Sequence, residues 1–405
     1  MHVAFRRCLI IAAGWLHRWS VDLCFQLSRG YYGERCFTAK RVETAWKLPI
    51  QLAASDRVKA SLRRCTQHKR ASGACGPMTI ALYDAAQVER LLDHPGCIVA
   101  MRAAMQALSV SDETQPLRQI LKIEDKILFG VMPGGLRAID GFGAKLVSVT
   151  EHPARRGRSR HRGVVVLFSV KYGDIECIAD AEAVTAIRTA CATAAATDVL
   201  ARADAAVLTV FGTGAQAAAH VRALRHVRHF ERVVIWGRSL DAAAALAEKL
   251  AAETGLAIEA EPDGQRAAGE ADVICTVSGS TEPILLGEWV PKGVHVNLVG
   301  SSYLGPVEVD SALVASARYI ADYRQGVLAQ ASELAVARQA GLVSDTHVAG
   351  EIGQVFAGTI AGRERADQIT IYKSLGHVVQ DLAATAYLHR RARSDPPGLE
   401  QAHGA

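Results

Sequence analysis

The hydrophobic pattern divides the chain into regions of different character. Between residues 205 and 323, short and continuously apolar runs alternate with stretches in which apolar residues recur every three or four positions. Continuous apolar runs are typical of strands in a parallel sheet that is covered on both faces, and the longer period is typical of amphipathic helices. The alternation therefore predicts an α/β fold with a doubly wound parallel sheet of the Rossmann type.

The same pattern predicts the elements of this region. A first helix covers residues 215–227, and a second covers 239–255 and is closed by Gly255, because glycine readily adopts the left-handed conformation that follows many helices. The connections are short, as expected of alternating strands and helices. The predicted strands are 206–212, 232–237, 257–261, 272–278, 294–300 and 319–323.

The flanking segments follow another pattern. Before the alternating region, a helix is followed by strands at 142–149, 163–170 and 175–180 and by a long alanine-rich helix at 183–201. After Tyr323 only helical patterns follow, and the simplest architecture inserts the sheet domain into a second, α+β domain. The predicted parts are an extension at 1–77, a substrate and dimerisation domain at 78–200 and 325–393, a dinucleotide-binding domain at 201–324, and a tail at 394–405.

Charge sets residues 1–77 apart from the rest. This segment has 14 Lys and Arg against 4 Asp and Glu, which leaves 32 against 37 for the remainder of a chain whose net charge is +5. Because the body is mildly acidic and the basic segment shows no recognisable binding fold, we expect no nucleic-acid partner. We interpret the extension as a disordered arm or as a start site assigned too far upstream.

Cysteine usage and hydropathy predict the compartment. The nine cysteines lack the spacing of metal ligands, and the four beyond the extension stand in apolar contexts, as small buried side chains do in a reduced cytoplasm. No apolar run reaches the roughly 18 to 20 residues of a membrane-spanning helix. The segment CLIIAAGWL resembles a signal peptide, yet no convincing cleavage site follows it. We expect a cytoplasmic protein without a metal or a membrane partner. The four cysteines are Cys97, Cys177, Cys191 and Cys275.

A glycine-rich turn, VFGTGAQA, joins the first predicted strand to the first helix. Gly212 would make the tight turn, Gly214 would let the backbone approach a pyrophosphate, and Ala217 would let helix and strand pack closely. The amides at the helix start then face the phosphates. We predict a dinucleotide site here, and its residues are Gly212, Thr213, Gly214, Ala215 and Gln216.

The end of the second strand predicts which dinucleotide binds. Proteins that bind NAD usually have Asp or Glu there for the ribose hydroxyls, whereas this chain has Arg238 and Ser239. An arginine without a neighbouring acid suits the 2′-phosphate of NADPH, which we therefore favour over NADH; a solvated surface arginine is the alternative. Thr276 and Ser278, after the fourth strand, are expected to line the same cleft.

Several separated motifs resemble the ornithine cyclodeaminase/μ-crystallin family. They occur in the family's order between about residue 78 and residue 393. The resemblance implies a nucleotide-binding domain between the two halves of a substrate-binding domain, and a homodimer. The motifs are GFGAKLVSV, ADAEAVTAIRTACATA, VFGTGAQA, ICTVSGSTEPIL, HVNLVGSS with GPVEVD, and IYKSLGHVVQDLAA.

The resemblance also implies roles for four side chains. Lys145 stands where the family has a substrate-binding lysine, and Arg188 and Arg118 stand where it has arginines that hold the substrate carboxylate. A buried arginine needs an anion, so an internal ion pair is the alternative for Arg188. His161 matches a histidine near cofactor and substrate in μ-crystallin-like members. It is a candidate proton donor to an imine, or else a loop residue that orders the cleft.

Ser302 distinguishes between reactions of the family. Cyclodeaminases have an aspartate at the corresponding place, as acid and base for the distal amine of the substrate, and a serine cannot replace it at neutral pH. The resemblance is therefore to the ketimine reductase branch, which transfers hydride from NADPH to a cyclic imino acid such as Δ1-pyrroline-2-carboxylate or Δ1-piperideine-2-carboxylate. The predicted catalytic residues are Lys145, Ser302 and His161.

Three alternatives stay open at this point. The first is an ornithine cyclodeaminase, which forms L-proline and ammonia, and the second is another amino-acid enzyme of the family. The third is a non-catalytic NADPH-dependent binding protein of the crystallin type.

Other polar residues in the motifs have structural explanations. Asp310 is expected to cap the following helix. We expect His220 on a helix surface and His295 at a strand start, and we expect Lys373 and Ser374 at the start of a helix near the cofactor.

Overall fold

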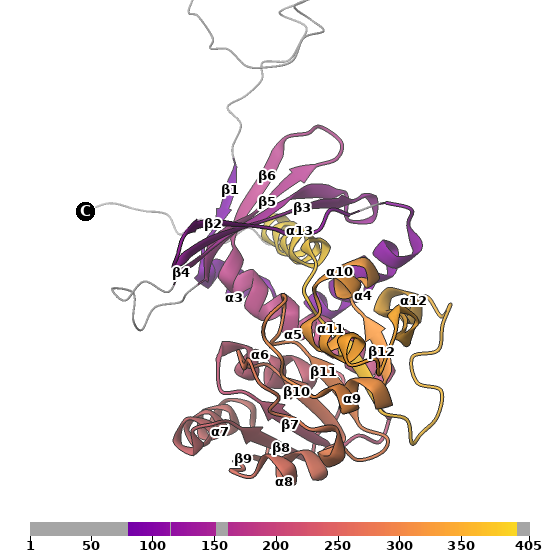
Figure 1. Cartoon of the computed structure of the whole chain (residues 1–405). Coiled ribbons are helices and arrows are strands. Elements are labelled where there is room, and N and C mark those ends of the chain that lie inside the picture. Colours follow the sequence, from indigo (N-terminus) through magenta and orange to yellow (C-terminus); the bar gives the residue numbers. More distant parts are fainter. Residues whose placement is uncertain (1–79, 114, 151–160, 395–405) are drawn as a thin grey trace, which may run out of the picture. The chain divides into compact units, whose positions relative to one another are not determined.

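The computed structural model describes residues 80–113, 115–150 and 161–394. These residues form two sheets and the helices that pack on them (Figure 1). The predicted extension and nearly all of the predicted tail lie outside the described residues. None of the helices in the described ranges is long and apolar enough to cross a membrane; the cytoplasmic location stays a prediction.

One sheet has eight strands, all parallel, in the order β13-β12-β14-β11-β10-β7-β8-β9. The six strands predicted from apolar runs are all present in it, which confirms the Rossmann-type sheet. The bounds are β7 (Val207–Phe211), β8 (Arg232–Trp236), β9 (Ile258–Ala260), β10 (Val273–Thr276), β11 (His295–Leu298), β12 (Arg318–Ala321), β13 (Val348–Glu351) and β14 (Thr370–Lys373).

The helices around this sheet begin and end where local chemistry indicates. Gly255, with φ +72°, follows α7 in the left-handed conformation, as predicted. The Asp310 carboxylate accepts from the Leu313 amide at 3.0 Å and caps α9, as predicted. The helices are α6 (Ala215–Leu224), α7 (Leu240–Thr254), α8 (Gly264–Gly269), α9 (Ser311–Ser316), α10 (Arg324–Gln330), α11 (Ser332–Gln339) and α12 (Ile352–Phe356), with 3-10 turns at Gly287–Trp289 and Asp345–His347.

The prediction of helices alone after Tyr323 was wrong, because β13 and β14 belong to this sheet. β14 pairs with β11 on one side and β12 on the other. All four of its residues are buried, so it shows no alternation of apolar and polar positions. Lys373 accordingly ends a strand and does not begin a helix.

The second sheet has six strands in the order β1-β6-β5-β4-β3-β2. Its strands pair antiparallel except β1 with β6. The predicted strands at 142–149, 163–170 and 175–180 are confirmed, while β2 and β3 did not emerge from the pattern. The bounds are β1 (Ala81–Tyr83), β2 (Gln119–Glu124), β3 (Ile127–Leu136), β4 (Gly141–Thr150), β5 (His161–Ser169) and β6 (Ile175–Asp180), with a 3-10 turn at Arg137–Ile139.

Two buried helices connect the sheets. α13 (Val378–Ser394) packs on β3, β4 and β5, and α5 (Ala181–Leu200) contacts α13, α6, β11 and β14. Most residues of α5 are buried, so other elements pack on most of its sides. Its many alanines allow this close approach because their side chains are small. Two more helices, α3 (Ala85–Leu91) and α4 (His94–Val110), pack against α5.

Two predictions about buried side chains have different outcomes. The four cysteines beyond the extension are free and buried, as expected. His220 was expected on a helix surface, and this was wrong, because α6 presents it to α5. Its ring nitrogens lie 2.7 Å from the Gln216 carbonyl and 3.1 Å from the Thr193 hydroxyl, and burial lowers its pKa to about 4.

Candidate active site

The glycine-rich turn lies between β7 and α6 with its second glycine facing open space. Gly212 has φ +146°, and an added Cβ would lie 3.0 Å from Val277, so a side chain would be strained there. At Gly214 a Cβ would meet no atom within 4 Å. The first amides of α6, at Ala215 and Gln216, have no partner within the helix. Backbone donors beside open space fit a pyrophosphate.

A cleft extends from this turn along the carboxyl ends of β8 and β10. It contains Arg238, which is exposed and makes no hydrogen bond or ion pair with another described residue. Ser239 is used differently, since its hydroxyl accepts from the Ala242 amide at 3.3 Å and caps α7. The lining residues are Gly212, Thr213, Gly214, Trp236, Gly237, Arg238, Val277, Ser278, Gly279, Ser280 and Ile284.

Glu308, which the sequence reasoning did not select, organises one wall of this cleft. Its carboxylate is fully buried and accepts from the Thr276 hydroxyl at 2.8 Å, from the Ser278 amide at 2.7 Å and from the Gly300 amide at 2.8 Å. Burial raises its pKa despite these donors. Thr276 and Ser278 thus bind the same carboxylate as the Gly300 amide, and Glu308 joins the loop after β10 to the loop after β11. Of Thr276 and Ser278, only Ser278 lines the cleft.

A buried ion pair fixes the loop that follows β11. The Lys373 ammonium lies 3.0 Å from the Glu333 carboxylate and donates to the Ser301 carbonyl at 2.6 Å, with all three residues fully buried. The Ser301 hydroxyl donates to Glu333. Ser302, the next residue, is half-buried at the end of this held segment. Because β11 ends at Leu298, Ser302 lies beyond the carboxyl end of this strand, as predicted.

The predicted substrate cations Lys145 and Arg188 meet at one carboxylate. Lys145 on β4 and Arg188 on α5 lie 3.2 Å and 2.9 Å from the same oxygen of Asp381 on α13. Arg188 also donates to the Gln380 side chain at 2.7 Å, and Lys145 donates to the Thr185 hydroxyl at 2.6 Å. The internal ion pair, which was the alternative to carboxylate binding for Arg188, is therefore present, and the carboxylate role stays a prediction.

Burial and the ion pairs act against each other at this cluster. Burial raises the pKa of the Asp381 carboxyl, but Arg188 and Lys145 outweigh it and hold this pKa below its usual range. For the Lys145 ammonium, burial prevails over Asp381 and lowers its pKa to about 8. Lys145 is therefore mostly protonated at neutral pH and gives up its proton more readily than an ordinary lysine.

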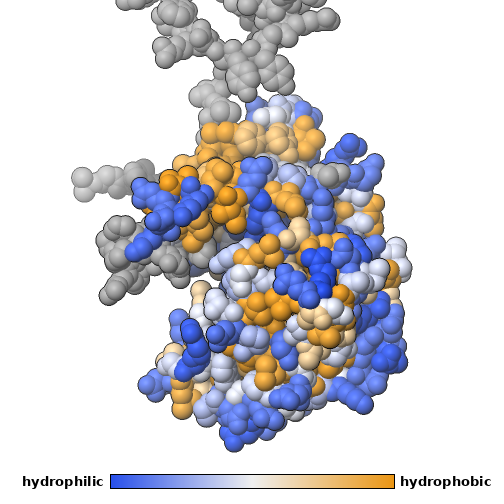
Figure 2. Space-filling model, viewed as in Figure 1, coloured by the Kyte–Doolittle hydropathy of each residue, from blue (hydrophilic) through white to orange (hydrophobic). Residues whose placement is uncertain are grey.

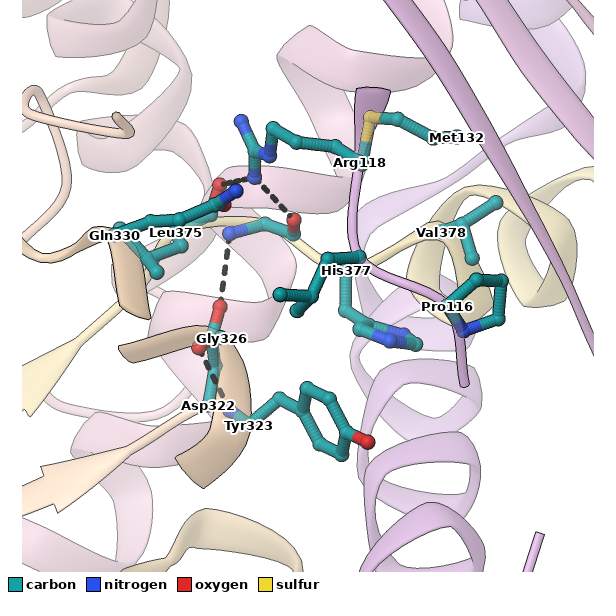
Figure 3. A pocket seen from close by; sticks show the side chains of 12 residues that line it. Pro116, Arg118, Met132, Asp322, Tyr323, Gly326, Gln330, Leu375, His377 and Val378 are labelled. Atoms are coloured by element: carbon teal, nitrogen blue, oxygen red, sulfur yellow. Dashed lines mark hydrogen bonds between the residues drawn. The ribbon is translucent and has the colours of Figure 1, made fainter. Parts of the chain in front are cut away.

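Arg118 joins the cluster through the loop before α13. Its guanidinium donates to the carbonyls of Leu375 and Gly376 at 2.6 Å and 2.8 Å (Figure 3). Gly376 has φ +79°, and a Cβ there would lie 2.9 Å from a guanidinium nitrogen of Arg188. The loop thus separates the two arginines by one glycine, and only glycine fits. All three predicted substrate cations are brought together here.

A cavity opens beside Arg118 (Figure 3). Asp322, at the end of β12, faces it, but its carboxylate accepts from the amides of Tyr323 and Gly376 at 2.7 Å and 2.8 Å. Burial raises the pKa of Asp322, with these amides and Arg118 acting in the opposite direction. The lining residues are Pro116, Leu117, Arg118, Met132, Asp322, Tyr323, Gly326, Gln330, Leu375, Gly376, His377 and Val378.

The structure does not test the role predicted for one residue, His161. His161 begins β5 opposite Val149 of β4, but its side chain lies outside what the structure describes. Its role stays a prediction. His377 is the converse case: sequence reasoning passed over it inside the motif IYKSLGHVVQDLAA, and the structure places it in the cavity wall.

Comparison with known proteins identifies the family of this chain. A family model described as "Ornithine cyclodeaminase/mu-crystallin family" matches residues 79–395. The chain is 32% identical over 263 residues to a Δ1-pyrroline-2-carboxylate reductase of Bacillus cereus, over 65% of this chain and 81% of that protein.

Two solved structures resemble the fold. Thermococcus litoralis Δ1-pyrroline-2-carboxylate reductase, in complex with NADH and L-proline, aligns with a TM-score of 0.75 and 25% identity over 78% of this chain and 98% of that one. An archaeal alanine dehydrogenase dimer with bound NAD aligns with a TM-score of 0.73 and 26% identity over 78% and 97%. The chain belongs to the ornithine cyclodeaminase/mu-crystallin family, as its motifs predicted.

Proposed function

We propose that this protein reduces a cyclic imine that carries one carboxylate, Δ1-pyrroline-2-carboxylate or Δ1-piperideine-2-carboxylate, with a nicotinamide cofactor. The observation that carries the proposal is the summed charge of five groups in and near the cavity, of which Arg118 and Asp322 line its wall. Arg118, Lys145 and Arg188 supply three positive charges, and Asp322 and Asp381 supply two negative ones. One anionic group on the substrate would balance the site, because buried charges require partners.

The residue at the strand end favours reduction over ammonia release. A cyclodeaminase needs a base for the distal amine of ornithine, and the half-buried hydroxyl of Ser302 cannot serve as one at neutral pH. A second ammonium in the substrate would also add to the excess of positive charge. The names of the similar Bacillus and Thermococcus proteins support the reductase over the cyclodeaminase.

The residues of the chain would bind and orient the substrate and deliver a proton. The cofactor, when bound, supplies the hydride that adds to the imine carbon. Arg118 and Arg188 would hold the carboxylate, and Lys145, with its pKa lowered to about 8, would donate a proton toward the imine nitrogen. Ser302 would face the ring from the loop that Lys373 and Glu333 hold in place.

Oxidation of NADPH, followed by absorbance, tests the reaction. The purified full chain is expected to oxidise NADPH when either imine is added, and to release no ammonia from L-ornithine with NAD. Ammonia and proline from ornithine would instead make the protein a cyclodeaminase. No oxidation with either imine would contradict the reductase and leave a binding protein of the crystallin type.

We further propose that NADPH is preferred over NADH. The support is Arg238, an exposed cation in the cleft wall without an ion pair among the described residues. Replacing Arg238 with alanine is expected to raise the KM for NADPH about 10- to 100-fold, as loss of a charged hydrogen bond does, and to leave the KM for NADH within about twofold. Arg232→Ala, at the start of β8 and therefore at the other end of the strand that leads to Arg238, serves as a control, because its guanidinium already pairs with Glu259. Equal changes for both cofactors would contradict the 2′-phosphate contact.

The exposed apolar edge strand of the six-stranded sheet supports a homodimer. Ile120, Leu121 and Ile123 on the edge strand β2 are 51%, 51% and 60% exposed. Figure 2 shows apolar surface gathered where Figure 1 places β2 and β3. Exposed apolar edge strands are usually covered by a partner. Light scattering is expected to give twice the mass of one chain, and a monomer at micromolar concentration would contradict the dimer.

A further inference from the structure

His377 lies in the cavity wall beside Arg118, at the start of α13. Its side chain is only 8% exposed, and its ring lies 4.9 Å from the ring of Tyr323, measured between centroids (Figure 3). The neighbouring walls include the apolar side chains of Met132 and Val378. The imidazole is therefore a polar group enclosed in the cavity, and none of the roles assigned so far uses it.

The hydrogen bonds of His377 determine which ring nitrogen carries the proton. The Val379 amide donates to Nδ1 at 3.2 Å, and since an amide only donates, Nδ1 must be unprotonated. In a neutral imidazole the proton then sits on Nε2. Nε2 is buried and has no partner among the described residues. The cavity thus contains a buried N–H donor without an acceptor, which is uncommon in proteins.

The ring stays neutral at physiological pH. Burial lowers the pKa of His377 to about 4, and Arg118 and Arg188 act in the same direction, against Asp381. His377 is consequently not a source of protons for an imine. It is a neutral donor whose geometry is fixed by the backbone of α13.

Either a bound water or a ligand can supply the missing acceptor. The Nη2 of Arg118 donates to two carbonyls, so the other N–H groups of the guanidinium remain available for an anion. The carboxylate of Asp322 already accepts from two amides. A carboxylate has only acceptors and can bind more than one donor at once. Arg118 and His377 both line the cavity, and each has an N–H donor that no described residue accepts, so a carboxylate is a ligand that suits the cavity.

We propose that the Nε2–H of His377 binds the carboxylate of the substrate, together with Arg118. This assignment rests on the proposed imine reduction, in which the substrate carries one carboxylate. His377 is then a binding residue that positions the imine, with no part in the transfer of protons.

Two substitutions separate this role from capping of α13. In His377→Asn the side-chain oxygen replaces Nδ1 as acceptor for the Val379 amide, but no donor reaches the position of Nε2. In His377→Gln the amide nitrogen reaches the position of Nε2, but the acceptor for Val379 is lost. Binding of a carboxylate predicts that glutamine preserves function and asparagine does not, whereas a structural cap predicts the reverse.

The measurements are the KM for the imine and the affinity for pyrrole-2-carboxylate, an unreactive planar carboxylate, titrated against the protein with bound NADPH. For His377→Asn, the KM and the dissociation constant are expected to rise about 10- to 100-fold, as for loss of a hydrogen bond to a charged group, and for His377→Gln less than about fivefold. The KM for NADPH should stay unchanged in both. A glutamine variant that binds pyrrole-2-carboxylate no better than the asparagine variant overturns the proposal.

The two proposals fail in different ways. If the unsubstituted protein turns over no imine but pyrrole-2-carboxylate binding follows the predicted order of variants, the reaction is wrong and the role of His377 stands. If imines are reduced and both variants behave alike, the reaction stands and the role of His377 is wrong.

Discussion

Replacing Arg188 with alanine is expected to lower kcat/KM for a cyclic imine about 100- to 1,000-fold, the range for losing one partner of a buried charge pair. Arg188 is 4% exposed and holds Asp381 at 2.9 Å, while Gln380 fixes another of its nitrogens at 2.7 Å. Without it, the substrate carboxylate loses a planar donor, and Asp381 is left with Lys145 alone.

Binding of NADPH separates this result from general unfolding. The glycine-rich turn and Arg238 are not part of the cluster, so the dissociation constant of NADPH is expected to stay within about threefold, since distant sites act independently. Arg188→Lys keeps the positive charge but lacks the planar guanidinium with its paired N–H donors, so it should recover only part of the activity. Arg102→Ala, which removes a half-exposed ion pair with Asp198 at the far end of α5, should have little effect. Unchanged turnover by Arg188→Ala would exclude its carboxylate role.

Replacing Lys373 with methionine is expected to lower the free energy of unfolding by about 3 to 5 kcal/mol, because the buried Glu333 carboxylate then has no positively charged partner. Both side chains are fully buried, and the ammonium also holds the Ser301 backbone at 2.6 Å. Urea denaturation measures the loss. Imine turnover should fall as well, since Ser302 follows directly on the segment that is released.

A second substitution should restore most of this stability. Combining Lys373→Met with Glu333→Gln removes both charges, and a buried pair replaced as a whole is often nearly neutral. Arg338→Met is the matched control. Arg338 lies on α11, as Glu333 does, but its ion pair with Asp345 lies at the surface. Its loss should be below about 1 kcal/mol. Equal losses for Lys373→Met and Arg338→Met would contradict the buried pair.

The sequence predicted those parts of the fold that depend on local patterns. Strands β7 to β12 lie in mainly apolar runs, and Gly255 and Asp310 are local capping signals. β14 escaped prediction because four buried residues show no period, and their place in a sheet is set by neighbours distant in the sequence.

The same limit applies to the site. The residues that match family motifs could be named, and the structure brings Arg118, Lys145 and Arg188 together. The carboxylate that Lys145 and Arg188 share could not be named, because Asp381 lies 193 positions from Arg188. The partner of Lys373 could not be named either, because Glu333 lies 40 positions away. It could also not be foreseen that Nε2 of His377 has no partner among the described residues, since this depends on the rotation of one ring against the backbone of α13.

The position of β14 has a consequence for biosynthesis. The ribosome makes β11 and β12 long before β14, yet β14 lies between them in the sheet. Until residue 373 has emerged, β11 and β12 have no strand to join them, and each presents an unpaired edge that can pair with other chains. The parallel sheet therefore stays in two separate parts until β14 has been made, and both edges are exposed to wrong pairing until then.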